Sequence, residues 1–164
     1  MTQRTIGPLH FERAAYDDPV AAEMIEAVQR FYEVRYGGRD ATPVSPEQFA
    51  PPHGLFLVGR LAGEPAVCGG WRVVEPGLAE VKRMYVVEAH RGRGLSRHLL
   101  TAIEASATRA GIRRLRLETG HRQPEAIRLY ETSGWSPIEK FGVYRDEPGS
   151  SCYGKELAEP CRYG

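Results

Sequence analysis

The chain has 164 residues, 41% of them apolar and 26% charged, and its 22 basic and 21 acidic residues leave a formal net charge of +1. This composition predicts one globular domain over residues 1–164 and excludes a disordered chain, a collagen or a coiled coil. The balanced charge argues against a nucleic-acid partner, and the absence of a signal peptide or a long apolar run predicts a cytoplasmic protein without a membrane partner.

The N-terminal quarter of the chain predicts a strand followed by a helix. Residues 5–13 have the pattern of an edge strand. Apolar residues then recur at helical spacing, with Asp17 or Asp18 able to cap the helix and Pro19 suited to its first turn. Gly37 marks the end of this helix, because glycine readily adopts the left-handed conformation that terminates helices.

A proline-rich loop and a series of hairpins come next. Residues 39–53 contain four prolines and predict a loop, with a short helical turn at 45–49. Strands are predicted over residues 55–58, 65–74 and 78–87, with tight turns between them. A bulge is expected at Gly69–Gly70, in the middle of the second of these strands.

The pattern changes in the C-terminal half to alternating helices and strands. The predicted order is a helix over 91–110, a strand over 113–119, a helix from about 123 to 134, and strands around 135–139 and 151–157. A strand–helix–strand crossover requires a parallel pair of strands. We therefore expect an α/β fold with one parallel pair in an otherwise antiparallel sheet.

A glycine-rich turn between a strand and a helix is the most informative segment. The strand that ends near Val87 leads into a turn with Gly92 and Gly94, and a helix begins directly after it. Helix N-termini carry unpaired backbone N–H groups and partial positive charge, and glycine lets a phosphate approach that backbone closely. Three arginines at positions 91, 93 and 97 add charge, so the turn predicts a phosphate or pyrophosphate site.

Three known phosphate-binding motifs can be compared with this turn. The P-loop requires a Gly-Lys-Ser/Thr ending, which is missing, and the Rossmann fingerprint requires a glycine where Arg97 stands. The spacing Arg/Gln-x-x-Gly-x-Gly/Ala is met by Arg91, Gly94 and Ser96, with serine in place of the usual small residue. This spacing resembles the acetyl-CoA signature of the GCN5-related N-acetyltransferase (GNAT) superfamily.

A second motif downstream strengthens this resemblance. The segment Gln123–Trp135 is similar to the superfamily pattern Asn-x-x-Ala-x-x-Leu-Tyr-x-x-x-Gly-Phe/Tyr, with Gln123 replacing the usual asparagine. The resemblance covers residues 54–157 and implies a GNAT fold: a mixed, mostly antiparallel sheet with a central splayed parallel strand pair and about four flanking helices. It also implies an acetyltransferase with acetyl-CoA as co-substrate and a small-molecule or peptide amine as acceptor.

The resemblance also assigns residues to the cofactor. The pantetheine arm is expected to lie along the strand before the turn and the pyrophosphate in the turn itself. The residues expected to bind acetyl-CoA are Tyr85, Val86, Val87, Arg91, Gly92, Arg93, Gly94, Leu95, Ser96, Arg97 and Gln123. A backbone N–H on the same strand is expected to stabilise the oxyanion.

Acetyl transfer from a thioester to an amine requires a base and an acid. An ammonium with a reference pKa near 10.4 must lose a proton before it attacks, and the departing thiolate must gain one. Tyr130 is the predicted acid, because a phenol with a pKa of about 10 is protonated at neutral pH. Glu80, at the start of the strand that leads into the turn, is the predicted base, and Glu118 on the following strand is its rival.

Other features leave alternatives open or predict nothing specific. Cys68, Cys152 and Cys161 have no CxxC or CxxH spacing, so neither a disulfide framework nor a metal site is expected. Acceptor-facing residues are sought in the 31–53 region and in the late loop over 141–149, where aromatic residues could line a slot. A non-catalytic acyl-CoA-binding module is the alternative function, and homodimers are common in families of this kind.

Overall fold

The computed structural model describes residues 8–158, which form one seven-stranded sheet with the strand order β1-β2-β3-β4-β5-β7-β6. The strands are β1 (Leu9–Arg13), β2 (Gly54–Leu61), β3 (Glu64–Glu75), β4 (Leu78–Val86), β5 (Arg114–Gly120), β6 (Ser136–Pro137) and β7 (Ser150–Glu156). All neighbours pair antiparallel except β4 and β5, which are parallel. The mixed sheet with one parallel pair is therefore confirmed, while residues 5–7 of the predicted first strand lie outside the described range.

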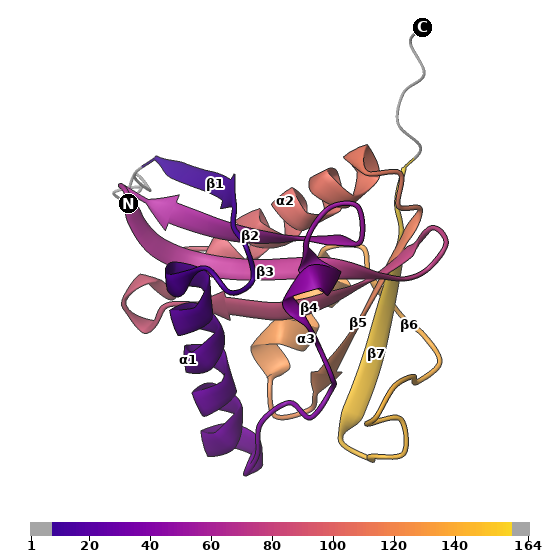
Figure 1. Cartoon of the computed structure of the whole chain (residues 1–164). Helices are drawn as coiled ribbons and strands as arrows, with labels where there is room; N and C mark the ends of the chain where they lie inside the picture. Colours follow the sequence, from indigo (N-terminus) through magenta and orange to yellow (C-terminus); the bar gives the residue numbers. More distant parts are fainter. Residues whose placement is uncertain (1–7, 159–164) are drawn as a thin grey trace, which may run out of the picture.

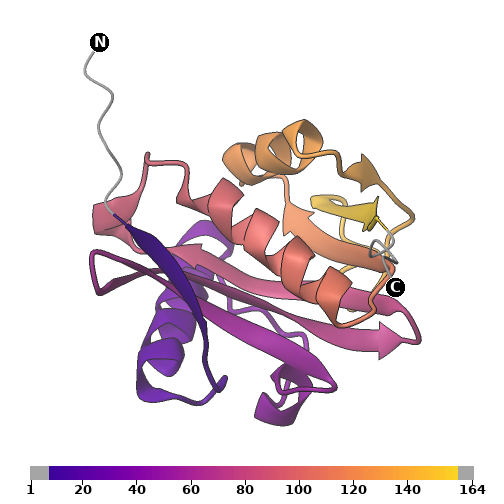
Figure 2. The same ribbon diagram turned by 90° about the horizontal axis from the view of Figure 1, so that it is seen from above.

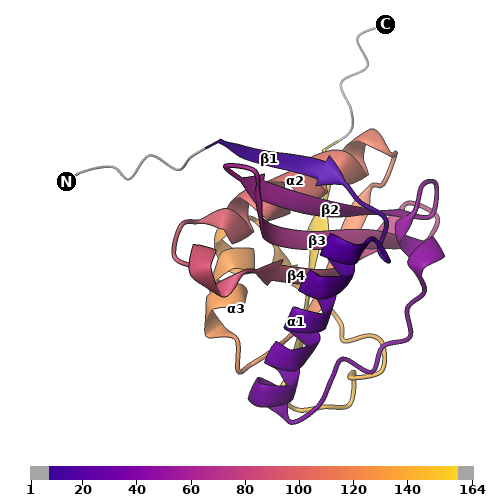
Figure 3. The ribbon, with the colours of Figure 1, turned by 60° about the vertical axis from the view of Figure 1, so that its left-hand side comes forward.

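Helices cover both faces of this sheet. They are α1 (Pro19–Tyr36), α2 (Leu95–Arg109) and α3 (Pro124–Thr132), with two short 3₁₀ helices, η1 (Pro46–Phe49) and η2 (Glu88–His90). Figures 1 and 2 show α1 on one face and α2 on the other, and Figure 3 shows α1 in front of β3 and β4. Within residues 8–158, no helix is both long enough and apolar enough to cross a bilayer.

Helix α1 begins and ends at the residues that the sequence predicts. The Asp18 carboxylate accepts hydrogen bonds from the backbone N–H groups of Val20 and Ala21, at 3.1 and 3.4 Å. These contacts satisfy donors that a helix start leaves unpaired. Gly37 ends the helix with a left-handed φ of 80°. The buried face of α1 packs on the sheet through Met24, among other residues.

Helix α2 begins at Leu95, four residues later than the sequence predicts. Gly92 and Gly94 have φ values of 77° and 74°, which are left-handed and cannot continue a right-handed helix. The turn therefore extends through Gly94, which stands at the N-cap position. From Leu95 onward the helix buries Leu99 and Ile103 fully against the sheet.

Strands β4 and β5 pair over only three residues and then separate. Their register joins Leu78–Glu80 of β4 to Arg114–Arg116 of β5, and no pairing between them continues beyond these residues. In Figure 1, β2 and β3 run across the view whereas β7 runs nearly vertically, so the two halves of the sheet diverge. The splayed parallel pair expected from the family resemblance is thus present.

A bulge in β4 accompanies this separation. The register between β3 and β4 shifts between Cys68 and Gly70, where the sequence predicts an irregularity. The extra residue lies on β4, however, and Arg83 there has a left-handed φ of 63°. Side chains from Met84 and helix α2 crowd the space beside Gly69. The bulge is therefore at the position along β3 that the glycines predict, but the extra residue belongs to the partner strand β4.

Candidate functional site

Two cavities open on either side of the place where β4 and β5 separate. The first, the turn cavity, has a volume of about 300 Å³ and lies between the glycine-rich turn, β4, α1 and the start of α3. The second, the loop cavity, has a volume of about 480 Å³ and is lined by both of the separated strands. Its walls come from α1 and the loop after it, from β4 and β5, and from the segment before β7.

Most residues predicted to bind the cofactor line the turn cavity. These are Tyr85, Val86, Arg91, Gly92, Gly94, Leu95, Ser96 and Gln123. Arg97 instead donates hydrogen bonds to the hydroxyls of Ser133 and Thr132, at 2.9 and 2.8 Å. Val87 donates its backbone N–H to the Ala66 carbonyl at 2.8 Å. Arg93 is exposed. Arg93, Arg97 and Val87 are therefore absent from the lining of either cavity.

The open glycine turn fits a phosphate group. A β-carbon added at Gly92 or Gly94 would meet no atom within 4 Å, so the space above the backbone is free. No side chain caps the first turn of α2, whose N–H groups point toward that space. Arg91 lies beside it, with its guanidinium over the Tyr85 ring and its Nε donating to the Val86 carbonyl at 3.2 Å. Unpaired N–H groups, a helix N-terminus and a nearby cation suit a pyrophosphate.

Three residues line both cavities and so form a shared wall: Met84, Gln123 and Tyr130. Tyr130 is 7% exposed and its ring packs against the rings of Trp135 and Tyr153. Its hydroxyl lies 3.9 Å from the Met84 sulfur, which is a weak acceptor. Burial raises the pKa of Tyr130, so the phenol is protonated at neutral pH. A group that reacts at the boundary of the two cavities would be close to this proton.

The two glutamates considered as bases occupy different surroundings. Glu118 lines the loop cavity. Burial, with smaller contributions from the Asp40 and Glu80 carboxylates, raises the pKa of Glu118 to about 7, although Lys82 acts to lower it. Glu80 is 6% exposed and is absent from the lining of both cavities. It forms ion pairs with Arg72, Lys82 and Arg116 at 3.8, 3.8 and 3.5 Å.

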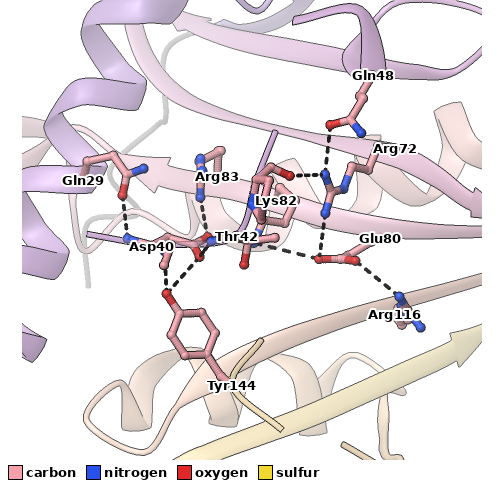
Figure 4. A network of polar contacts seen from close by, with 12 residues as sticks. Gln29, Asp40, Thr42, Gln48, Arg72, Glu80, Lys82, Arg83, Arg116 and Tyr144 are labelled. Atoms are coloured by element: carbon pink, nitrogen blue, oxygen red, sulfur yellow. Dashed lines mark hydrogen bonds and ion pairs between the residues drawn. The ribbon is translucent and has the colours of Figure 1, made fainter. Parts of the chain in front are cut away.

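Asp40, in the loop after α1, is the centre of a polar network at the loop cavity (Figure 4). Its Oδ2 accepts a hydrogen bond from Lys82 Nζ at 2.7 Å and pairs with the Arg83 guanidinium. Its Oδ1 accepts from the Tyr144 hydroxyl at 3.2 Å and from the Thr42 N–H at 3.0 Å. Burial acts to raise the pKa of Asp40, but Lys82, the Thr42 N–H and Arg83 outweigh it and hold this pKa well below its usual range.

The acceptor region expected from the sequence is partly found in this cavity. Tyr32, Tyr36 and Tyr144 line it. Phe141 instead stacks under the Arg116 guanidinium, whose carbon lies 3.8 Å from the ring centroid. Asp40, and Lys82 and Arg83 on β4, are not predicted from the sequence as site residues. A single aspartate in a proline-rich loop belongs to no motif, and its contacts with the two cations form only in the folded chain.

Comparisons with known proteins agree with this geometry. The model of the Acetyltransferase (GNAT) family matches residues 21–135. An IAA acetyltransferase of Azospirillum brasilense is 35% identical over 136 residues, covering 82% of this chain and 89% of the relative. A candidate acyl-CoA N-acyltransferase of Klebsiella pneumoniae is 31% identical, with a TM-score of 0.77 over 92% of this chain and 98% of that chain. A GNAT family acetyltransferase of Elizabethkingia anophelis, solved with acetyl-CoA bound, shares the fold, with 14% identity and a TM-score of 0.68 over 91% of this chain and 98% of that chain.

Proposed function

We propose that this chain, which belongs to the GNAT family of acetyltransferases, transfers an acetyl group from acetyl-CoA to a primary amine by direct attack in a ternary complex. The observation that carries the proposal is the shared wall. Tyr130 and Met84 face both the turn cavity, which fits a pyrophosphate, and the loop cavity, which holds a titratable carboxyl. Two substrates bound in these cavities would meet at Tyr130, and no covalent enzyme intermediate is needed.

In the proposed reaction, Glu118 accepts the proton and Tyr130 donates one. The ammonium of the acceptor loses a proton to Glu118, whose pKa of about 7 suits a base at neutral pH. The amine nitrogen forms a bond to the carbonyl carbon, the carbon–sulfur bond breaks, and the departing sulfur takes the Tyr130 proton. The bonded nitrogen gives up its second proton to the Tyr130 phenolate, which restores the phenol. Glu118 is preferred over Glu80 because it lines the cavity, whereas Glu80 is enclosed by three cations.

The backbone of β4 is the proposed binding edge for the acyl chain. Beyond Glu80, β4 has no strand partner on its β5 side. The Val86 carbonyl on that side already accepts a hydrogen bond from Arg91 Nε at 3.2 Å. The other polar backbone groups on that side could pair with an extended ligand, as an added strand would. On its other side β4 is occupied, since the Val87 N–H donates to Ala66 of β3. The proposed oxyanion donor is therefore an N–H of β4 that points into the gap.

Thermal melts with three ligands test the cofactor part of the proposal. Acetyl-CoA should stabilise the protein by about 2.7 kcal/mol at a hundredfold excess over its dissociation constant. NADH and ATP should stabilise it far less, because the turn lacks the Rossmann and P-loop endings. An equal response to all three ligands, or no response to acetyl-CoA, would contradict acyl-CoA binding.

Gly94→Val should abolish acetyl-CoA binding measured by calorimetry. Gly94 has a φ of 74° and faces open space, so the valine side chain would fill the room that we assign to the pyrophosphate. Gly111→Val is the matched control, because Gly111 has a φ of 85° and also faces open space, at the opposite end of α2. Both variants should lose similar stability, about 1–2 kcal/mol, from the left-handed backbone. Equal affinity of the two variants for acetyl-CoA would place the pyrophosphate elsewhere.

A further inference from the structure

The wall of the loop cavity at Asp40, Lys82 and Arg83, together with the charged residues packed behind it, holds more positive than negative charge. Arg72, Lys82, Arg83 and Arg116 meet around the carboxylates of Asp40 and Glu80 (Figure 4). The four cationic side chains are 2–23% exposed, so water screens them only in part. Two carboxylates against four cations leave this cluster, which we call the cationic floor, with an excess of positive charge.

Hydrogen bonding shows the same imbalance. The buried Nε atoms of Arg72 and Arg116 have no hydrogen-bond acceptor among the described residues. Lys82 Nζ has one acceptor at hydrogen-bond distance, Asp40 Oδ2, whereas an ammonium carries three donors. The Glu80 contacts of the cluster, at 3.5–3.8 Å, are ion pairs longer than a good hydrogen bond. The cationic floor therefore has unsatisfied donors: those of Lys82 at the cavity wall, and the Nε atoms of Arg72 and Arg116 buried behind it.

The remaining charged groups that face the loop cavity do not cancel this excess. Glu118 is about half ionised near neutral pH, and Tyr144 is an uncharged phenol that already donates to Asp40. At the mouth, exposed Arg122 and Glu147 carry opposite charges. Arg39 is paired with two carboxylates on α1, and His121 contacts the Gly149 carbonyl.

An acceptor that carries only an ammonium would add positive charge beside this floor. Like charges within a few ångströms in a half-buried cavity repel, because the effective dielectric constant there is below that of water. An acceptor with an anionic group next to its amine avoids this charge repulsion. Its anion can accept a hydrogen bond from Lys82 while its ammonium faces Glu118. Both residues line the cavity.

We propose that the acceptor is a zwitterionic amine of the α-amino acid class, whose carboxylate binds at Lys82 on the cationic floor while its amine faces Glu118. The inference rests on the proposed acetyl transfer and adds its substrate class. Lys82 precedes Met84 of the shared wall by two residues of β4, so the carboxylate and the amine need be only a few ångströms apart. Tyr32, Tyr36 and Leu117 provide a partly apolar wall for the acceptor side chain.

Product binding tests the class without relying on turnover. Calorimetry on the complex with coenzyme A compares the N-acetyl derivatives of glycine, methionine and phenylalanine with the amide of each. The acids should bind at least about tenfold more tightly than the amides for one pair or more, since a charge-assisted hydrogen bond is lost in the amide. If no acid binds, or if no acid binds more tightly than its amide, the inference is overturned.

A pair of variants tests the assignment to Lys82. Lys82→Met should remove the preference for the acid, while Arg109→Gln, an exposed cation at the far end of α2, should leave it unchanged. If Lys82→Met prefers the acid over the amide as strongly as the wild type does, the assignment is overturned. The preference is a ratio of two affinities measured on the same protein, so a change in the stability of the variant does not affect it.

Thiol release with the parent amines separates the two proposals. Acetylation of amides as fast as acids overturns the inference alone, whereas preferential acid binding without thiol release from any amine contradicts the proposed transfer alone.

Discussion

Tyr130→Phe should lower kcat by about 10²–10⁴-fold while leaving the affinity for acetyl-CoA nearly unchanged. The phenyl ring retains the packing against Trp135 and Tyr153, and only the hydroxyl is lost. Among residues 8–158, the partner of this hydroxyl is the weakly accepting Met84 sulfur at 3.9 Å, so its removal leaves no strong donor or acceptor unsatisfied. Single-turnover measurement of thiol release would isolate the chemical step from product release.

Tyr153→Phe is the matched control for that prediction. Tyr153 is also buried and also packs against Tyr130, but its hydroxyl donates to Glu131 at 3.1 Å and lies outside both cavities. This control should retain wild-type turnover. A Tyr130→Phe variant with nearly full turnover, under conditions where chemistry limits the rate, would make Tyr130 a packing residue. The acid would then be sought in the segment that contains Tyr144 or in a bound water.

Glu118→Gln should lower kcat/KM by about 10²–10⁴-fold and remove the part of the pH profile that Glu118 controls. With a pKa of about 7, Glu118 is protonated and inactive as a base at low pH. The wild-type rate should therefore rise with pH through about 7, separately from any later rise set by the acceptor ammonium. The variant should retain only the later rise.

Glu80→Gln is the control carboxyl, and it also tests the assignment made from the sequence. If Glu118 is the base, Glu80→Gln should keep the rise near pH 7, whereas loss of the rise in this variant alone would restore Glu80 as the base. Stability gives a second readout, because a carboxyl with a raised pKa binds its proton more tightly in the folded state. Wild-type stability should fall as pH rises from about 4.5 to about 7, and Glu118→Gln should lack this contribution.

Local signals predict most of the fold. Asp18, Pro19 and Gly37 define α1 because capping and termination depend on residues next to each other in sequence. The glycine turn and the Gln123–Trp135 segment predict the cofactor side for the same reason, since each is a continuous stretch. The predicted start of α2 is four residues too early, because the arginines of the turn are compatible with a helix and only the left-handed backbone at Gly92 and Gly94 excludes it.

The acceptor side depends on contacts that one stretch of sequence does not contain. Glu80 and Glu118 look equivalent in sequence, because each lies on a strand next to the predicted glycine-rich turn or its following helix. Their difference comes from the register: Glu80 lies opposite Arg116 where β4 and β5 still pair, whereas Glu118 lies beyond the separation. In the sequence, nothing distinguishes Arg116 from the neighbouring Arg113 and Arg114, yet its guanidinium forms an ion pair with Glu80 and lies over the Phe141 ring. The surroundings of these three side chains are set by tertiary packing, which a single stretch of sequence does not show.

The contact between Asp40 and Tyr144 has a consequence for how this enzyme could change its substrate in evolution. The two residues are 104 positions apart and lie in separate loops, yet each completes the same cavity wall. A substitution in one loop would leave a polar partner unsatisfied in the other, so a new acceptor preference should require paired changes. The glycine turn contacts neither residue and could remain as it is, which lets selection alter the acceptor and keep the acyl donor.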